Sequence, residues 1–134
     1  MVRFTLLMVA LLTSVGCAPI QKQTCRSGEQ AAVTESIYFG TNKPGGIVSA
    51  EDWAAFVNES VTPAFPEGLT SWAAAGQWRM ASGTIEREVS HILQLTHDDS
   101  PQRNQALETI VNKYKREFQQ EAVLRVRSQT CIRF

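Results

Sequence analysis

Two apolar periodicities alternate along residues 36–134, and their order restricts the fold more than any single residue does. Two stretches have apolar residues at helical spacing, 49–63 and 100–118. Four other stretches are strand-like: 36–41, 69–80, 86–96 and 123–134. The order β-α-β-β-α-β predicts an α+β, ferredoxin-like two-layer sandwich with a four-stranded antiparallel sheet. Two helices would cover one face of this sheet and leave the other face open.

Both predicted helices begin at a serine. Ser49 and Ser100 are favourable N-cap residues, and Pro101 occupies the first helical position after Ser100. The apolar side chains of the two helices should pack against those of the first and last strands. The predicted core consists of Ile37, Phe39, Trp53, Phe56, Val57, Val61, Leu107, Ile110, Val111, Tyr114, Phe118, Leu124 and Val126.

The last predicted strand has two chemically different faces. Leu124 and Val126 alternate with Arg125 and Arg127, and Cys131 shares the face of the arginines. We expect the apolar face to join the core and the arginine face to stay open. The arginines would then either bind an anionic ligand or protect an edge strand by charge.

The first seventeen residues have the organisation of an export signal. Arg3 precedes an apolar run over 4–12, small residues follow, and Cys17 comes directly after them. The run is too short to cross a bilayer, which takes about 20 residues. Residues 14–17 resemble the lipobox of bacterial lipoproteins, in which the cysteine is acylated and begins the mature protein. Plain secretion stays open as an alternative, because Ser14 stands where a lipobox usually has leucine.

These features divide the chain into three parts. We expect a signal peptide over 1–16, a lipid-anchored tether over 17–35 and a single α+β domain over 36–134. The expected location is the periplasm or cell envelope, with the lipid in the outer membrane if the envelope is Gram-negative. The membrane, reached through this anchor, is the first expected partner.

The remaining two cysteines are expected to form a disulfide. Export leads to an oxidising compartment, where thiols pair. With Cys17 acylated, Cys25 and Cys131 are left. The last strand should run antiparallel to the first, so Cys131 would lie near the point where the tether enters the fold. Two unpaired thiols are the alternative, if the tether is too mobile to hold the geometry.

Composition argues against several classes of function. The formal net charge is zero, so no surplus of basic residues exists to neutralise nucleic-acid phosphates. His91 and His97 have no third ligand at a suggestive spacing, and we expect neither a metal nor another cofactor. No catalytic motif is legible. We therefore favour a binding or interaction module that uses the open sheet face for a homodimer or an envelope protein, and leave an enzyme open.

Four residues on the second and third predicted strands are candidate binding residues. Trp78 and Arg79 could form an aromatic platform beside a guanidinium that pairs with a carboxylate. Glu88 and His91 lie on the strand that should pair with this segment, and with Arg79 they could form a polar site for a small ligand or for acid–base chemistry. The structural alternative is that Trp78 packs under a helix and the charges form cross-strand pairs.

Several stretches of the domain form a pattern that a known family shares. They are Tyr38-Phe39-Gly40, Trp53 with Phe56, the segment 62–70, Gly76-Gln77-Trp78-Arg79, Glu86-Arg87-Glu88, Tyr114, Phe118, Gln120 and Val123-Leu124. Together they resemble a bacterial family of exported proteins, domain of unknown function 3574. The resemblance covers residues 36–134 and implies the domain limits and the exported address, without an activity or catalytic residues.

We predict that Cys17 is acylated after cleavage behind Gly16. Radiolabelled palmitate should enter the protein in growing cells, and Cys17→Ala should remain unlabelled because it lacks the thiol that carries the lipid. Cys25→Ser serves as the control and should keep the label. Label retained by Cys17→Ala, or a mature chain that begins at another residue, would contradict the assignment.

Overall fold

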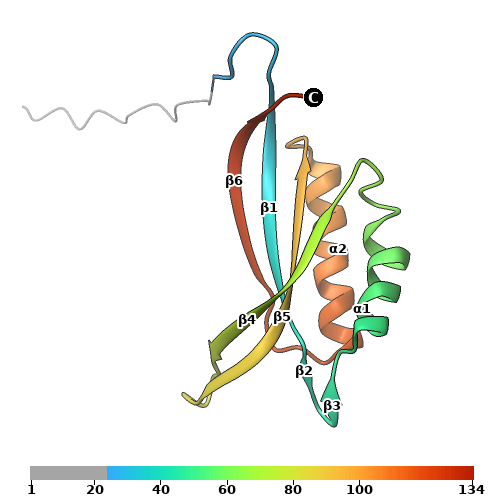
Figure 1. The fold of residues 1–134 in the computed structure, drawn as a ribbon, viewed down its shortest axis with the longest axis vertical. Helices are drawn as coiled ribbons and strands as arrows, with labels where there is room; N and C mark the ends of the chain where they lie inside the picture. Colours follow the sequence, from blue (N-terminus) through green and yellow to red (C-terminus); the bar gives the residue numbers. More distant parts are fainter. Residues whose placement is uncertain (1–23) are drawn as a thin grey trace, which may run out of the picture.

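A computed structural model of the chain describes residues 24–134. Its main sheet has four antiparallel strands in the order β4-β5-β1-β6. Both helices pack on one face of this sheet, which confirms the predicted α+β, ferredoxin-like two-layer fold (Figure 1). The sheet strands are β1 (Gln30–Gly40), β4 (Thr70–Arg79), β5 (Ile85–His97) and β6 (Leu124–Ile132).

The helices occupy the positions that the periodicity predicted. The first begins as α1 (Ala50–Phe56) and continues as a π-helix, η1 (Val57–Val61), and the second is α2 (Pro101–Glu117). Ser49 caps α1, where its hydroxyl accepts a hydrogen bond from the Asp52 amide at 3.0 Å. Ser100 caps α2 in the same way. A short two-stranded ribbon, β2 (Asn42–Lys43) and β3 (Gly46–Ile47), connects β1 to α1.

The core between helices and sheet is largely aromatic. The Phe39 and Tyr114 rings lie 4.6 Å apart, and the Phe56 and Tyr114 rings lie 5.0 Å apart. The Tyr114 hydroxyl donates a hydrogen bond to the Gly40 carbonyl, so this buried polar group is satisfied. Ten of the predicted core residues are buried: Ile37, Phe39, Trp53, Phe56, Val61, Leu107, Ile110, Val111, Tyr114 and Phe118.

The prediction for β6 was wrong: its apolar face lies outside. Leu124 and Val126 are 48% and 47% exposed on the open face. Arg125 is instead directly opposite Ile37 and Arg127 opposite Glu35, which places both arginines on the helix side of the sheet. There Arg125 pairs with Glu108 of α2, and Arg127 pairs with Asp99.

The reason for this orientation is a buried carboxylate. Glu35 is fully buried on the helix side, and its Oε1 lies 3.0 Å from Nη2 of Arg125 and 3.8 Å from Nε of Arg127. An ionised carboxylate that is removed from water costs several kcal/mol unless a cation and hydrogen bonds compensate it. β1 begins at Gln30, six residues before the predicted first strand. Glu35 therefore belongs to the sheet, although the sequence placed it in the tether.

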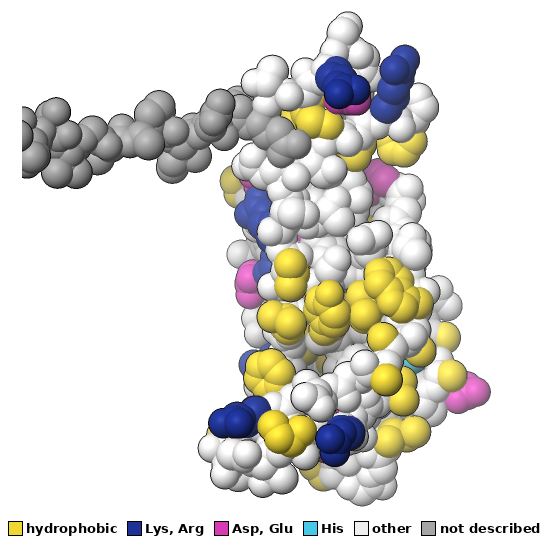
Figure 2. Space-filling model, turned by 60° about the vertical axis from the view of Figure 1, so that its left-hand side comes forward, with side chains coloured by type: hydrophobic (Ala, Val, Ile, Leu, Met, Phe, Trp, Pro, Cys, Tyr) yellow, Lys and Arg dark blue, Asp and Glu magenta, His cyan; other side chains and the backbone are white. Residues whose placement is uncertain are grey.

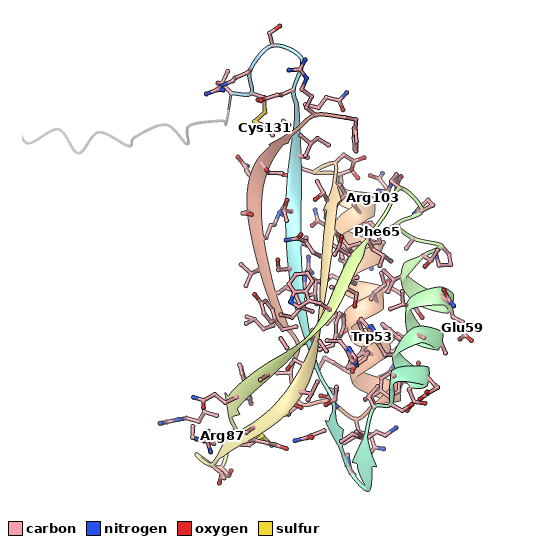
Figure 3. The ribbon with its side chains drawn as sticks, in the orientation of Figure 1. Trp53, Glu59, Phe65, Arg87, Arg103 and Cys131 are labelled. Carbon is pink, nitrogen blue, oxygen red and sulfur yellow. A yellow bond between two sulfur atoms is a disulfide. The ribbon has the colours of Figure 1, made fainter. Side chains whose placement is uncertain are left out.

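The structure contains the predicted disulfide between Cys25 and Cys131, with a Cα–Cα distance of 5.6 Å. Cys131 pairs with Ala31 at the start of β1, near one end of the sheet (Figure 3). Cys131 lies on the helix side of the sheet and not on the open face, where it was expected. Its partner Ala31 lies outside the part of β1 that pairs with β5, which begins at Val33. The disulfide therefore fixes the segment before β1 to the end of β6.

Two truncations test which face of the sheet forms the core. Ile110→Ala should lower the free energy of unfolding by about 2–5 kcal/mol, the usual range for a large-to-small change in a packed core. Val126→Ala should cost less than about 1 kcal/mol, because this side chain is already half in water. Denaturant unfolding of both variants measures the difference. Similar losses in the two variants would mean that β6 faces the core with its apolar side.

Candidate functional site: a pocket on the open sheet face

An apolar row crosses the face of the sheet that the helices leave open. Trp72, Ile92, Tyr38 and Leu124 are in register across β4, β5, β1 and β6. Trp72 is 43% exposed, and Trp78, further along β4, is 45% exposed. Figure 2 shows hydrophobic side chains gathered over this face. Such a contiguous exposed apolar surface is typical of a binding site.

A pocket of about 490 Å³ opens beside this row. β1, β4 and β5 contribute to its lining, with Trp78 near the end of β4 and Met80 directly after that strand. β2 and the segment 119–122 also line it. The pocket arises because β1 ends at Gly40, whereas the β4–β5 hairpin continues beyond it, as the register shows. Side chains of the overhanging hairpin therefore face a space that no further strand fills.

Glu88 lies in a notch that glycine creates. A Cβ atom on Gly40 would lie 2.6 Å from Oε1 of Glu88, closer than real Cβ contacts come. Gly76 is directly opposite Glu88 on β4 and also carries no side chain. The carboxylate can therefore lie against the backbone of β1, and any larger residue at position 40 would displace it.

Asn42 holds two of the carboxylates that line the pocket, those of Glu86 and Glu88. Its backbone amide donates to Oε2 of Glu88 at 2.9 Å, and its side-chain amide donates to Oε1 of Glu86 at 2.6 Å. These bonds occupy one oxygen of each carboxylate and restrict its orientation. A single residue of β2 thus positions two acidic groups from β5.

The wall formed by residues 119–122 is also fixed by hydrogen bonds. The Gln120 side-chain amide donates to the carbonyls of Asn42, at 2.7 Å, and of Phe118, at 3.1 Å. Gln119 has a φ of 54°, the left-handed conformation that commonly terminates a helix. The end of α2 is in this way attached to β2 across the rim of the pocket.

The structure brings together only two of the four residues predicted as a site. Trp78 and Glu88 both line the pocket. Arg79 is in register with Ile85 at the end of the hairpin, and the alternation along β4 directs it to the opposite face from Trp78. His91 also lies on the helix side. The polar constellation of Arg79, Glu88 and His91 therefore does not converge.

His91 has a packing partner instead. Its ring stacks on Trp53 of α1 at 4.6 Å with an interplanar angle of 3°, and the Trp53 indole donates to the Ser71 hydroxyl at 3.1 Å. Figure 3 places Trp53 between α1 and the sheet. Burial lowers the pKa of His91 because the charged imidazolium would lose solvation. The stacking keeps this histidine away from the pocket.

Within residues 24–134, no group of three or more His, Cys, Asp or Glu side chains is placed to hold a metal ion. Neither helix there has the length and apolar character that crossing a bilayer requires.

The family described as protein of unknown function (DUF3574) matches residues 34–134. The chain belongs to this family. The stretches that carried the DUF3574 resemblance in the sequence are separated along the chain, yet several of them meet at the pocket. Nine of their residues line it: Tyr38, Gly40, Gly76, Gln77, Trp78, Glu86, Glu88, Gln120 and Leu124.

Solved structures with a similar fold include a phage SAM lyase in complex with S-methyl-5'-thioadenosine. The TM-score is 0.60 at 14% sequence identity, and the match covers 85% of this chain and 96% of that chain. The phage SAM lyase in its apo state matches with a TM-score of 0.54, also at 14% identity, over 85% of this chain and 97% of that one. At this identity the likeness shows a shared fold. No curated protein matches the sequence of this DUF3574 chain.

The stacked histidine leads to a prediction for the pH dependence of stability. The pKa of His91 is lower in the folded state than the ordinary histidine pKa of 6.5. As the pH falls below 6.5, the unfolded state therefore binds more protons than the folded state does. The contribution of His91 to stability should therefore be present above that pH and should decline on acidification. The free energy of unfolding of wild type minus that of His91→Gln should shrink between pH 7 and pH 5. A difference that grows on acidification would indicate a charged, paired histidine.

Proposed function

We propose that this DUF3574 protein is a lipid-anchored envelope module that binds a small ligand in the pocket on its open sheet face. The observation that carries the proposal is the combination of Trp78 and Tyr38 with two positioned carboxylates, Glu86 and Glu88, in one cavity. A volume of about 490 Å³ lies within the range of small-molecule sites. Such sites typically combine an apolar lining with a few placed polar groups.

The pocket is built before any ligand arrives. Asn42 holds both carboxylates, Gly40 leaves the space that Glu88 occupies, and Gln120 attaches the far wall to β2. A ligand would therefore not have to order these groups itself, which lowers the free-energy cost of binding. This arrangement supports a binding role more than a purely structural one.

The proposed anchor and the pocket suit each other geometrically. The disulfide of Cys25 with Cys131 lies at the start of β1, whereas the pocket lies where β1 ends (Figure 3). Eight residue steps separate Cys17 from Cys25, and they can reach at most about 28 Å. β1 has eleven residues and extends by roughly 36 Å at about 3.3 Å per residue. A lipid on Cys17 would thus hold the disulfide end near the membrane, with the pocket at the distal end.

A second candidate function is catalysis on a small molecule of the kind bound by the phage SAM lyase. The shared fold over most of both chains favours it. The direct test is incubation of the protein with S-adenosylmethionine and measurement of released S-methyl-5'-thioadenosine. Release that is lost in Glu88→Gln would favour the enzyme, and no release above the buffer would favour binding alone.

Two tryptophans allow a matched test of the binding proposal. Trp72 and Trp78 lie on the same strand and face with nearly equal exposure, but only Trp78 is part of the pocket lining. We expect at least one of three aromatic fragments (benzylamine, benzyl alcohol or phenylacetate) to bind the mature protein in saturation-transfer NMR. Trp78→Ala should weaken this binding about tenfold, since truncating an aromatic anchor commonly costs more than 1 kcal/mol. Trp72→Ala should leave it unchanged.

Other outcomes would separate the pocket from the open face as a whole. If no fragment binds, or if binding is lost equally in both variants, the proposal of a pocket ligand is wrong. Equal losses accompanied by a change in sedimentation would indicate that a second copy or a protein partner covers the whole apolar row. Gly40→Val provides an independent check, because it displaces Glu88 without altering either tryptophan.

A further inference from the structure

The charge of the pocket indicates which class of ligand it would bind. We infer that the pocket recognises an organic cation, with its positive group at Glu86 and Glu88 and an apolar or aromatic body against Trp78. This inference rests on the proposed function and adds the ligand class. It is carried by the lining, the hydrogen bonds within the pocket and the surroundings of its one lysine.

The pocket has an excess of negative charge. The charged residues in its lining are three glutamates, Glu86, Glu88 and Glu121, and one lysine, Lys43. The ammonium group of Lys43 lies 3.4 Å from Asp52 and 5.4 Å from the centre of the Phe118 ring. Its charge is therefore engaged at the rim and does not neutralise the carboxylates. A ligand without positive charge would leave those carboxylates partly desolvated and unpaired.

The hydrogen bonds leave the carboxylates able to accept from a ligand. Asn42 uses Oε2 of Glu88 and Oε1 of Glu86, so the second oxygen of each carboxylate is not part of these two bonds. Hydrogen bonds between a cation and a carboxylate are roughly twice as strong as neutral ones. The rings of Trp78 and Tyr38 in the same lining also favour a cation, through their quadrupoles.

Glu88 also lies close to a buried hydroxyl of the core. The Tyr114 hydroxyl donates to Gly40, the residue against which Glu88 lies. Burial raises the pKa of Tyr114, and the charges of Glu88, Asp52 and Glu117 raise it further.

The cation is organic rather than metallic. Ca²⁺ takes six to eight oxygen ligands, more than the five oxygens that two carboxylates and an amide carry, and Asn42 already bonds to one oxygen of each carboxylate. No cluster of three metal-ligating side chains occurs anywhere between residues 24 and 134. A cavity of about 490 Å³ is also much larger than one ion needs, and its apolar part suits a molecular body.

The three fragments test the inference because they have one ring and differ in charge. Benzylamine should bind the mature protein about tenfold more tightly than benzyl alcohol, with phenylacetate the weakest, in NMR titrations at pH 7. Glu88→Gln and Glu86→Gln should each reduce benzylamine binding toward that of benzyl alcohol. Glu59→Gln is the control: it removes an exposed carboxylate on the helix side, away from the pocket (Figure 3), and should have no effect.

The outcomes distinguish failure of this inference from failure of the proposed function. If benzylamine and benzyl alcohol bind equally and both depend on Trp78, the pocket binds ligands but selects no cation, and the inference is overturned. If benzylamine is favoured equally in wild type, Glu86→Gln and Glu88→Gln, the selectivity does not come from this site, and the inference is likewise overturned. If no fragment binds, the proposed function fails and the inference fails with it.

Discussion

The buried carboxylate of Glu35 determines which face of β6 turns toward the helices. With no exposure to solvent, it depends on Arg125 at 3.0 Å, and Arg125 can reach it only from the helix side of the sheet. Side chains alternate strictly along a strand, so moving Arg125 inward moves both of its neighbours outward. On that side Arg125 also pairs with Glu108, and Arg127 pairs with Asp99.

This one ionic contact has consequences for the opposite face. Leu124 and Val126 are directed outward, and Leu124 completes the row with Trp72, Ile92 and Tyr38. Leu124 also contributes to the lining of the pocket. The apolar character of the open face therefore depends on a polar interaction on the other side of the same strand. If β6 faced the other way, Arg125 and Arg127 would lie on the open face of the sheet in place of these apolar side chains.

The elements of the fold that were predicted correctly are those with strong local sequence signals. The two helices, their serine caps and their apolar stripes were predicted correctly, because spacing and capping act within one turn. β6 was assigned the wrong way round because a strand that alternates between apolar residues and arginines favours the apolar face inside by default. The residue that reverses this preference, Glu35, is ninety positions away in sequence. It also lay in a segment whose polar composition suggested a tether.

The pocket was only partly predictable for a related reason. Trp78 and Glu88 were noticed because aromatic and acidic residues are conspicuous on a strand, and strand pairing brings them together. Asn42, Gly40 and Gln120 have no distinctive local pattern, and they act through contacts between segments far apart in the chain. For Gly40 and Gln120 the signal that could have found them is the set of DUF3574-like stretches, since several of those stretches converge on the pocket once the chain is folded. Asn42 lies in none of these stretches.

β1 connects all of these features along one line. Near its start the disulfide attaches the segment that leads toward Cys17, at its middle Glu35 fixes the orientation of β6, and at its end Tyr38 and Gly40 enter the pocket. β1 also lies between β5 and β6 in the sheet, so both of its edges are hydrogen-bonded. A strand bonded on both sides is among the last elements to open locally. The pocket is thus supported by a strand that is bonded on both sides, as is β5 of the hairpin, while its remaining walls come from β4, β2 and the segment 119–122. Any adjustment of the pocket to a ligand would therefore fall on those walls and leave the disulfide end of the domain in place.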